Sequence, residues 1–294
     1  MTNNKKIFGV MSVIIASICY GLVPSFSFLS FRMGVATETL LFNKFLYAAI
    51  IMWVFIIVRK ISFKFSRNAT ITMIIACVGY ISMSTLLYIS FDYISGSLAT
   101  IVSFTFPAMI VTIEMVTRRE PVKATKIIAV ILSFTGLCLI VWAPDMEVNV
   151  IGVAFAFVAA MGYVVYIFGL SVESVKQENS FAVAGYVMAS AAGVNFIRCA
   201  VSGKPMFVTE PSQIGMMILL SVVCVFLAIL FYAIGVRFIG PGNAALINTL
   251  EPVLACIFGH ILVGDVLTKI MIVGSALVVT AVFITNLPEK QHGL

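Results

Sequence analysis

One carboxylate stands out because it lies near the middle of an apolar stretch long enough to cross a membrane. Glu251 falls within residues 242–263, with Pro252 directly after it and Asn248 three residues before it. An ionisable group at that depth is costly, so it faces a protein interior or a water-filled cavity. A low-dielectric setting favours the neutral carboxyl form, so Glu251 could exchange a proton or neutralise a cationic substrate. The alternative is a structural Glu that ties two helices at the proline bend.

Pro252 also has a counterpart earlier in the chain. It removes a backbone hydrogen bond and is expected to bend its helix. Residues 97–117 repeat the pattern of this stretch, with Pro107 at the position of Pro252. We predict both prolines as hinge points in equivalent helices.

Other polar residues at membrane depth are candidates for a binding site. Tyr20, Tyr163 and Tyr80 are expected to need partners for buried hydroxyl groups, and a cavity would supply them. Asn248 and Asn195 bind substrate or, more commonly, form hydrogen bonds between helices. Lys44 could attract an anionic group of a substrate, but we favour snorkelling of its long side chain to the membrane interface.

Several further residues have an ordinary interpretation. Glu114 and Arg118 are spaced as an ion pair on a helix surface, and His260 fits an interfacial histidine. The six cysteines lie in apolar segments without a CxxC spacing, so they predict neither a disulfide framework nor a zinc site. We expect no metal and no cofactor.

Composition defines the environment in which these residues must work. Of the 294 residues, 62% are hydrophobic and 10% are charged, and the mean hydropathy is +1.14. A soluble domain carries about a quarter charged residues, so this is an integral membrane protein. The pI of about 9.0 therefore indicates basic loops beside anionic lipid rather than nucleic-acid binding.

Ten apolar segments are long enough to cross a bilayer, which takes roughly 20 residues. Helices are expected because the backbone must satisfy its own hydrogen bonds in lipid, and no alternating barrel pattern occurs. The predicted fold is all-α, with spans at residues 8–29, 39–58, 70–91, 96–117, 125–142, 152–171, 181–200, 214–237, 242–263 and 269–286.

The positive charges predict the orientation. With the N-terminus inside, only four cations fall on outer segments, at Arg32, Arg198, Lys204 and Lys269. This asymmetry places both termini in the cytoplasm of a multi-pass cell-membrane protein, with a bacterial cytoplasmic membrane as the expected location. The inner segments hold Lys5, Lys6, Arg59, Lys60, Lys64, Arg67, Arg118, Arg119, Lys123, Lys126, Lys176, Arg237 and Lys290.

An internal repeat organises the chain. Gly9 begins the first predicted helix as Gly152 begins the sixth, and Tyr20 and Tyr163 follow at the same spacing. Five helices per half give two halves of opposite orientation, 1–146 and 147–294. Inverted repeats of this kind characterise secondary transporters, with the substrate site near the midplane between the halves.

Several motifs resemble the drug/metabolite transporter superfamily, EamA-like family. The resemblance covers essentially the whole chain as two tandem copies and implies a ten-helix carrier that alternates access between the two sides. Tyr20 and Tyr163 stand where this family often has Trp, and Lys44 stands where it often has Arg. The motifs are residues 88–101, Phe106-Pro107, Arg119-Glu120-Pro121, Leu250-Glu251-Pro252-Val253 and Gly264-Asp265.

We therefore predict a secondary transporter of a small organic metabolite, with amino acids or related compounds as first guess and export as the expected direction. Proton coupling through Glu251 would be one energy source. The alternative is a membrane receptor or structural subunit that binds a small ligand without moving it. We expect no enzyme, because no HExxH, GxSxG or Walker pattern occurs. Expected partners are the substrate and the lipid bilayer, but no nucleic acid, with a monomer or homodimer as oligomeric state.

Overall fold

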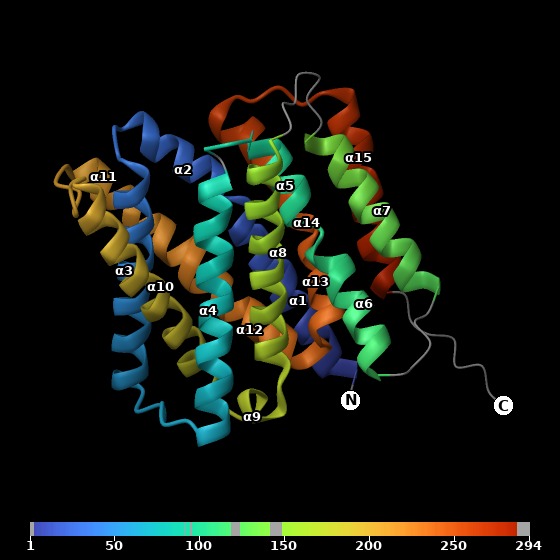
Figure 1. Ribbon diagram of the computed structural model, residues 1–294, viewed down its shortest axis with the longest axis horizontal. Helices are drawn as coiled ribbons and strands as arrows, with labels where there is room; N and C mark the ends of the chain where they lie inside the picture. The colour runs from blue at the N-terminus through green and yellow to red at the C-terminus, as the bar shows by residue number, and fades with distance from the viewer. Residues whose placement is uncertain (1–2, 91, 95, 119–123, 142–148, 287–294) are drawn as a thin grey trace.

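The chain is entirely helical over the residues that the structure describes (Figure 1). The structure is a computed structural model, and it describes residues 3–90, 92–94, 96–118, 124–141 and 149–286. In these ranges seven helical stretches are long and apolar enough to cross a membrane. Shorter apolar helices at Leu98–Glu114, Ala124–Ile140 and Lys269–Ile284 fall in the fourth, fifth and tenth predicted spans. The predicted all-α membrane fold is thus confirmed.

The helices of the first half are α1 to α7, and those of the second half are α8 to α15 with the π-helical segments η1 and η2. Their bounds are α1 Asn3–Gly21, α2 Val23–Arg32, α3 Thr37–Val58, α4 Arg67–Ser90, α5 Gly96–Ser103, α6 Phe106–Arg118, α7 Ala124–Val141, α8 Val150–Ser171, α9 Glu173–Lys176, α10 Ser180–Ser202, α11 Pro211–Leu219, η1 Leu220–Leu227, α12 Ala228–Ile239, α13 Pro241–Asn248, α14 Leu250–Phe258, η2 Gly259–Val263 and α15 Lys269–Asn286.

Three predicted spans contain breaks. The first is divided at Leu22 into α1 and α2, the fourth is divided after Ser103 into α5 and α6, and the ninth is divided at Thr249 into α13 and α14. In each case a proline lies in the first turn of the helix that follows the break. Proline is favoured there because the first backbone N–H groups of a helix have no intrahelical partner. The prolines are Pro24, Pro107 and Pro252.

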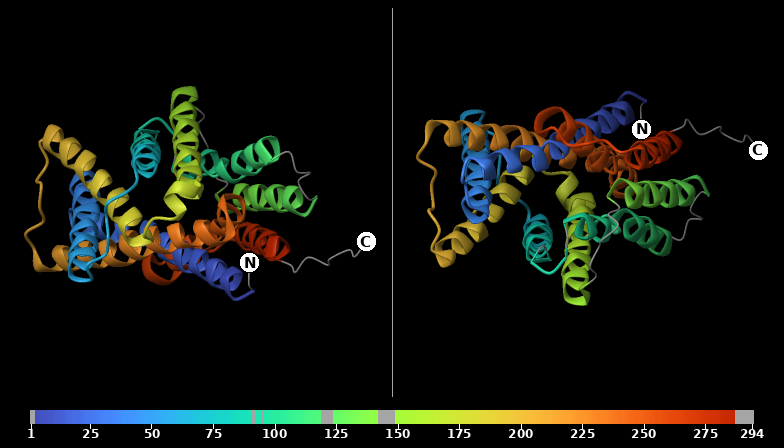
Figure 2. Two further views of the ribbon diagram at one scale, coloured as in Figure 1. Left: turned by 90° about the horizontal axis from the view of Figure 1, so that it is seen from below. Right: turned by 90° about the horizontal axis from the view of Figure 1, so that it is seen from above.

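The helix contacts repeat when the two halves are exchanged. α4 packs on α8 in the same way as α12 packs on α1, and α5 and α6 pack on α8 as α13 and α14 pack on α1. The pairs α3–α10 and α7–α15 join equivalent helices of the two halves. They lie at opposite ends of the long axis, with α1 and α8 between them (Figures 1 and 2).

Contacts of single residues follow the same duplication. The backbone of Gly9 lies against Phe238 and Ile239, and that of Gly152 lies against Tyr93 and Ile94. The first glycine of each half therefore meets the equivalent pair of residues in the other half. The match between Gly9 and Gly152 in the sequence thus reflects equivalent packing in the two halves.

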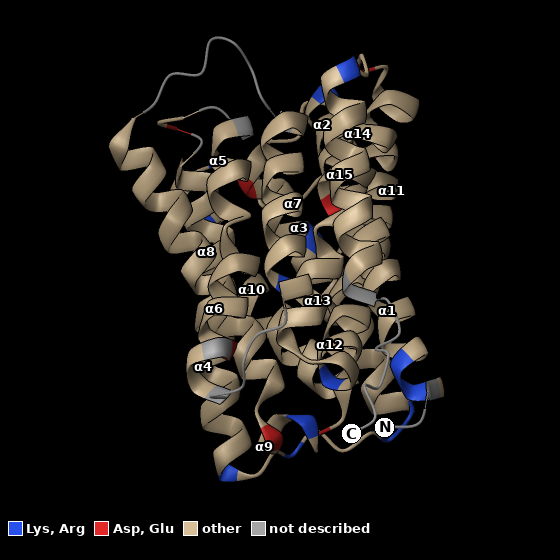
Figure 3. Cartoon of the chain, turned by 90° about the vertical axis from the view of Figure 1, so that its right-hand side faces the viewer, with Lys and Arg blue, Asp and Glu red and all other residues tan. Residues whose placement is uncertain are grey.

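The two ends of the bundle differ in charge. α1 begins and α15 ends at the same end, which we call the terminal side, and Lys and Arg gather there (Figure 3). α2, the start of α3 and the end of α4 lie at the opposite side. On the terminal side Gly240 joins α12 to α13 with φ of 80°, a conformation that glycine adopts without strain.

Close helix contacts depend on glycines where helices cross. A Cβ atom on Gly79 of α4 would lie 2.6 Å from the carbonyl oxygen of Gly162 in α8. The same contact is 2.5 Å between Gly136 of α7 and Gly274 of α15. Small residues allow such approach where lipid provides no hydrophobic drive for helix association.

We expect Gly79→Ala to destabilise the protein because the added methyl group meets backbone atoms that cannot rotate away. The expected loss is about 1–3 kcal/mol, measured as a lower apparent Tm in detergent. Gly193→Ala in α10 is the matched control, since its Cβ atom would meet no atom within 4 Å. Equal melting of both variants would contradict the close α4–α8 contact.

Candidate functional site

The break in the ninth span positions Glu251. α13 ends at Asn248, Thr249 interrupts the helix, and Glu251 lies in the first turn of α14. The Leu246 carbonyl accepts hydrogen bonds from the Thr249 hydroxyl (2.6 Å) and from the Thr249 backbone N–H (3.3 Å) at this break. A helix N-terminus carries partial positive charge from its unpaired N–H groups, so it is a favourable place for a carboxylate.

Asn248 holds the carboxylate through a short polar chain. Its Nδ2 donates to Oε2 of Glu251 at 3.0 Å, and its Oδ1 lies 3.2 Å from the Ser17 hydroxyl on α1. Ser17 and Asn248 are fully buried, whereas Glu251 is partly accessible. The predicted pair of Asn248 and Glu251 is therefore brought together, and Asn248 also links α13 to α1 as an interhelical tie.

A cluster of tyrosine rings lies beside this chain. Its rings join four helices from both halves, and the centroid distances between neighbouring rings run from 5.0 to 6.3 Å. The cluster includes all three tyrosines predicted for the site. Along the cluster the order is Tyr20 of α1, Tyr232 of α12, Tyr163 and Tyr166 of α8, and Tyr80 of α4.

The tyrosine cluster contains buried hydroxyl groups. The hydroxyl oxygens of Tyr20, Tyr166 and Tyr232 are buried and have no hydrogen-bond partner within the described ranges. Buried tyrosine hydroxyls usually find a partner, so the cluster holds polar groups that the described residues leave unsatisfied.

A cavity of about 880 Å³ connects Glu251 to the side opposite the termini. This volume suits a small molecule. Glu251, Pro252 and Cys256 form part of its wall, whereas Tyr20, Tyr80 and Tyr163 are not among the described residues that line it. The predicted pocket walls thus lie behind Glu251, in the tyrosine cluster, rather than on the open cavity.

The charged residues that line the cavity are mainly acidic. Four carboxylates border it, and Arg198 of α10 is the cation among its described lining residues. A low-dielectric cleft lined by one sign of charge concentrates ligands of the opposite sign. The cavity therefore favours a ligand that carries positive charge. The carboxylates belong to Glu38, Asp92, Glu251 and Asp265.

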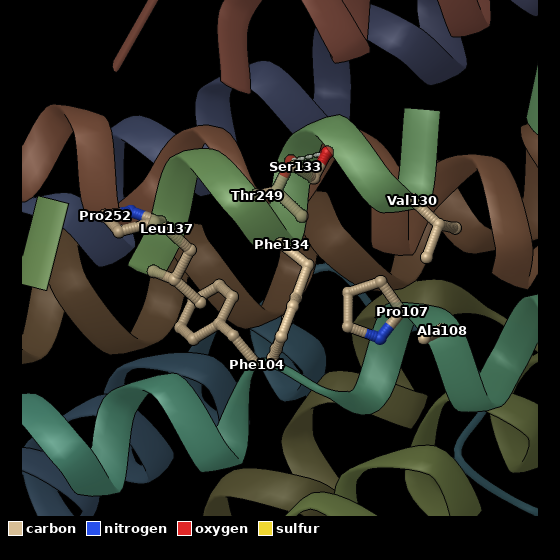
Figure 4. Close-up of a pocket in the computed structure, with 9 residues that line it drawn as sticks. All are labelled: Phe104, Pro107, Ala108, Val130, Ser133, Phe134, Leu137, Thr249 and Pro252. Carbon is tan, nitrogen blue, oxygen red and sulfur yellow. Dashed lines mark hydrogen bonds between the residues drawn. The ribbon is translucent and has the colours of Figure 1, made fainter. Parts of the chain in front are cut away.

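Two helix breaks meet at a smaller pocket beside α7 (Figure 4). Pro107 and Pro252 both line it, together with Phe104 and Thr249 at the breaks themselves. The hydroxyl oxygens of Thr249 and Ser133 on α7 lie 3.4 Å apart. The two prolines predicted as hinges are thus in the same region, although their motion stays a prediction.

Lys44 does not extend to the membrane interface, although the sequence favoured this. It is buried in α3, and its Nζ lies 5.2 Å from the centroid of the Phe45 ring. It forms no ion pair with Glu251 and does not line the described part of the large cavity. Its helix α3 packs on η1, a π-helical segment of a kind that often marks functional positions.

Asn195 and His260 make local contacts. Asn195 donates from Nδ2 to the Ala191 carbonyl of its own helix at 2.9 Å. None of its described contacts brings it close to Glu251. His260 lies at the exposed end of the ninth span, where Nδ1 is 2.7 Å from the Asp265 carbonyl oxygen. His260 lies where an interfacial histidine was expected, whereas the bond of Asn195 lies within α10 rather than between helices.

The expectation that Glu114 lies on a helix surface was wrong, whereas its pairing with Arg118 stays a prediction. Its side chain is buried, and Oε1 accepts a hydrogen bond from the Gly242 backbone N–H at 3.3 Å. Lys126 of α7 lies 3.4 Å from Oε2. The Arg118 side chain, its expected partner, lies outside the described residues. Spacing along one helix suggested a local partner, whereas Gly242 comes from the other half of the chain.

Sequence reasoning missed several contributors to the site. Ser17 resembles many small residues that serve close packing, so nothing in the sequence distinguished it. In the sequence, Asp92 and Arg198 are charged residues near helix ends and nothing more. The structure shows that both line the cavity. The Arg119-Glu120-Pro121 motif lies outside the described residues. Within the described ranges, no group of three His, Cys, Asp or Glu side chains could hold a metal ion.

Two related helical halves around a cavity that reaches a mid-membrane carboxylate define a membrane transporter of the inverted-repeat class. The model of the EamA-like transporter family matches the chain twice, at residues 7–142 and 150–287. The chain therefore belongs to the EamA-like transporter family, within the drug/metabolite transporter superfamily. The two matches establish duplicated halves, whereas the predicted boundary at residue 146 lies outside the described residues.

Individual relatives are distant but cover the chain almost completely. "Uncharacterized transporter YcbK" of Bacillus subtilis (strain 168) is 22% identical over 279 residues, which are 90% of this chain and 88% of the relative. A crystal structure of a protein at 14% identity superposes with a TM-score of 0.79 over 98% of this chain and 99% of that chain. The latter similarity supports the fold alone.

We expect a small cationic thiol reagent that cannot cross membranes to label Cys256 from the cavity side. Cys256 lines the cavity near Asp265, whereas Cys19, Cys77, Cys199 and Cys224 are buried. Cys138 is also partly accessible but does not line the cavity, so the measurement uses a Cys138→Ser background. Intact-mass spectrometry should show a label that disappears in Cys256→Ser. A label retained in that variant, or no label on the native protein, would contradict an aqueous path to this wall.

Proposed function

We propose that the chain is a secondary transporter that moves small amine-bearing metabolites, amino acids first among them, by alternating access. The observation that carries this proposal is the cavity that ends at Glu251 beside a helix break. A mid-membrane carboxylate reached by water from one side is the arrangement expected of a substrate or coupling site. A receptor that binds without transport needs neither the hinges nor the duplicated halves.

The charges support the choice of substrate. An ammonium group would pair with the Glu251 carboxylate. Asn248 holds this carboxylate in place with a hydrogen bond of 3.0 Å. Arg198 on the same cavity suits a substrate carboxylate, and no described residue forms an ion pair with it. The excess of acidic side chains favours a cationic or zwitterionic compound over an anionic one.

Alternating access requires that the terminal side be closed while the cavity is open. α6 packs against the start of α13 there, and Glu114 accepts a hydrogen bond from Gly242 while it pairs with Lys126. Charge-assisted hydrogen bonds of this kind are stronger than neutral ones. We infer that this contact, the Glu114 latch, must break when the transporter opens toward the terminal side.

The positive charges at the terminal side support its assignment to the cytoplasm. In this orientation the cavity opens outward, and the Glu114 latch closes the inner side. Glu251 would bind substrate or proton in turn, because either one neutralises a carboxylate that is costly to leave charged in the membrane. Competition of this kind would couple transport to a proton gradient, with export as the expected direction.

We expect Glu251→Gln to weaken substrate binding by about 30-fold, equivalent to about 2 kcal/mol, because the amine loses its charged partner. A thermal-shift screen of amino acids and amines identifies the ligand, and proteoliposome uptake then measures transport. The variant should also lose the dependence of transport on pH, since Gln does not titrate. Glu210→Gln, an exposed carboxylate before α11, is the matched control.

If Glu251→Gln lost transport but kept ligand binding, Glu251 would serve proton coupling and not substrate binding. Unchanged transport with unchanged pH dependence would overturn both roles. No binding or transport of any amine-bearing compound by the native protein would overturn the proposed substrate class.

We expect Glu114→Ala to shift the protein toward the inward-open state, because both the contact with Gly242 and the pair with Lys126 are lost. Labelling of Cys256 from the cavity side should then slow in proteoliposomes. Glu173→Ala on α9 removes an exposed carboxylate at the same side and should leave labelling unchanged. Equal labelling rates in the native protein and Glu114→Ala would count against the Glu114 latch.

A further inference from the structure

A second large depression lies between α4 and α10 and is separate from the transport cavity. It has a volume of about 900 Å³, and none of its described lining residues borders the cavity at Glu251. Met73, Ile74, Val78 and Ile81 of α4 give it an apolar wall. Ile74 and Val78 are exposed by 60% and 57%, as expected for residues that face lipid. We call this depression the lateral groove.

The length of the lateral groove corresponds to one leaflet. Its lining on α4 runs from Thr70 to Ile81, a helical rise of about 16 Å at 1.5 Å per residue. The hydrocarbon core of a bilayer is about 30 Å thick, so the groove covers about half of it. A single hydrocarbon chain of one leaflet therefore matches the groove in length and chemistry.

Aromatic residues mark the end of the groove nearest the terminal side as the level of the membrane interface. The Tyr186 ring lies 5.0 Å from Phe65 and 5.3 Å from Trp53, centroid to centroid. Its hydroxyl donates to the Phe63 carbonyl at 3.0 Å. Trp and Tyr are enriched at the level of lipid head groups, so this end of the groove lies where a head group would be.

Lys64 lines the groove at this same end and supplies a positive charge. It forms no hydrogen bond or ion pair with a described residue. Arg59 and Lys60 in the loop between α3 and α4, and Arg67 at the start of α4, add further positive charge, and positions 59–67 contain no acidic residue. Glu178, which accepts a hydrogen bond from the Ser66 backbone N–H at 3.2 Å, is the carboxylate in described contact with this loop. Clustered cations beside a membrane attract anionic lipid.

We propose that the lateral groove binds one anionic phospholipid from the leaflet on the terminal side. The acyl chain lies along α4 between Thr70 and Ile81, and the phosphate lies at Lys64. A second copy of the chain is a poorer occupant. A twofold interface through this face would bring two cationic loops together without acidic partners in the same loop.

The test is native mass spectrometry of the full chain after exchange into phosphatidylglycerol or phosphatidylcholine, together with the apparent Tm in each lipid. We expect the native protein to retain one phosphatidylglycerol at collision energies that remove phosphatidylcholine, with a higher Tm in the anionic lipid. Lys64→Gln should lose this preference. Lys6→Gln is the matched control, because it removes one charge at the same side on α1, away from the groove.

A second variant tests the apolar part of the site. Ala189→Phe places a ring in the groove while it leaves Lys64 intact, and it should lose the retained lipid altogether. Equal retention of both lipids by the native protein would overturn the proposal. So would an equal loss of preference in Lys64→Gln and Lys6→Gln. Dimers that Ala189→Phe converts to monomers would show that a second copy fills the groove instead.

Discussion

A carboxylate in the middle of a membrane must have polar partners and access to water, and the structure around Glu251 meets this constraint. The break at Thr249 turns the middle of a span into a helix N-terminus, whose unpaired N–H groups favour negative charge. Asn248 supplies a hydrogen bond, and the cavity supplies a path for solvent. Without the break, the same residue would face an apolar wall with no free backbone group nearby.

The duplicated fold provides this backbone twice, but the two halves use it differently. The breaks in α5–α6 and α13–α14 fall at equivalent positions, and Pro107 corresponds to Pro252. The residue equivalent to Glu251 is Phe106, whose ring packs on Tyr163 at a centroid distance of 4.7 Å. One half therefore supplies the charged group, and the other supplies an aromatic support beside the tyrosine cluster.

Sequence patterns predicted depth along the helices better than rotation around them. Glu251, Asn248 and the two prolines could be selected because charge and proline are rare at mid-span. Lys44 and Asn195 lie within the predicted helices but do not line the cavity, and the sequence could not show this because residues that face lipid and residues that face the core are both apolar. Nothing in a helical repeat shows which neighbour a polar side chain meets. For the same reason the partner of Glu114 was missed, although the helices themselves were predicted.

The difference between the two ends of the bundle also follows from unequal residues at equivalent positions. Glu114 joins α6 to the start of α13 on the terminal side. Its equivalent in the second half is Gly259, which has no side chain to form the matching contact on the opposite side. A hydrogen bond to a charged group contributes about 1.5–3 kcal/mol, enough to favour one of two otherwise similar states by tenfold or more. We propose that the repeat makes two states possible, and that Glu114 with Gly259 favours the state with an open cavity.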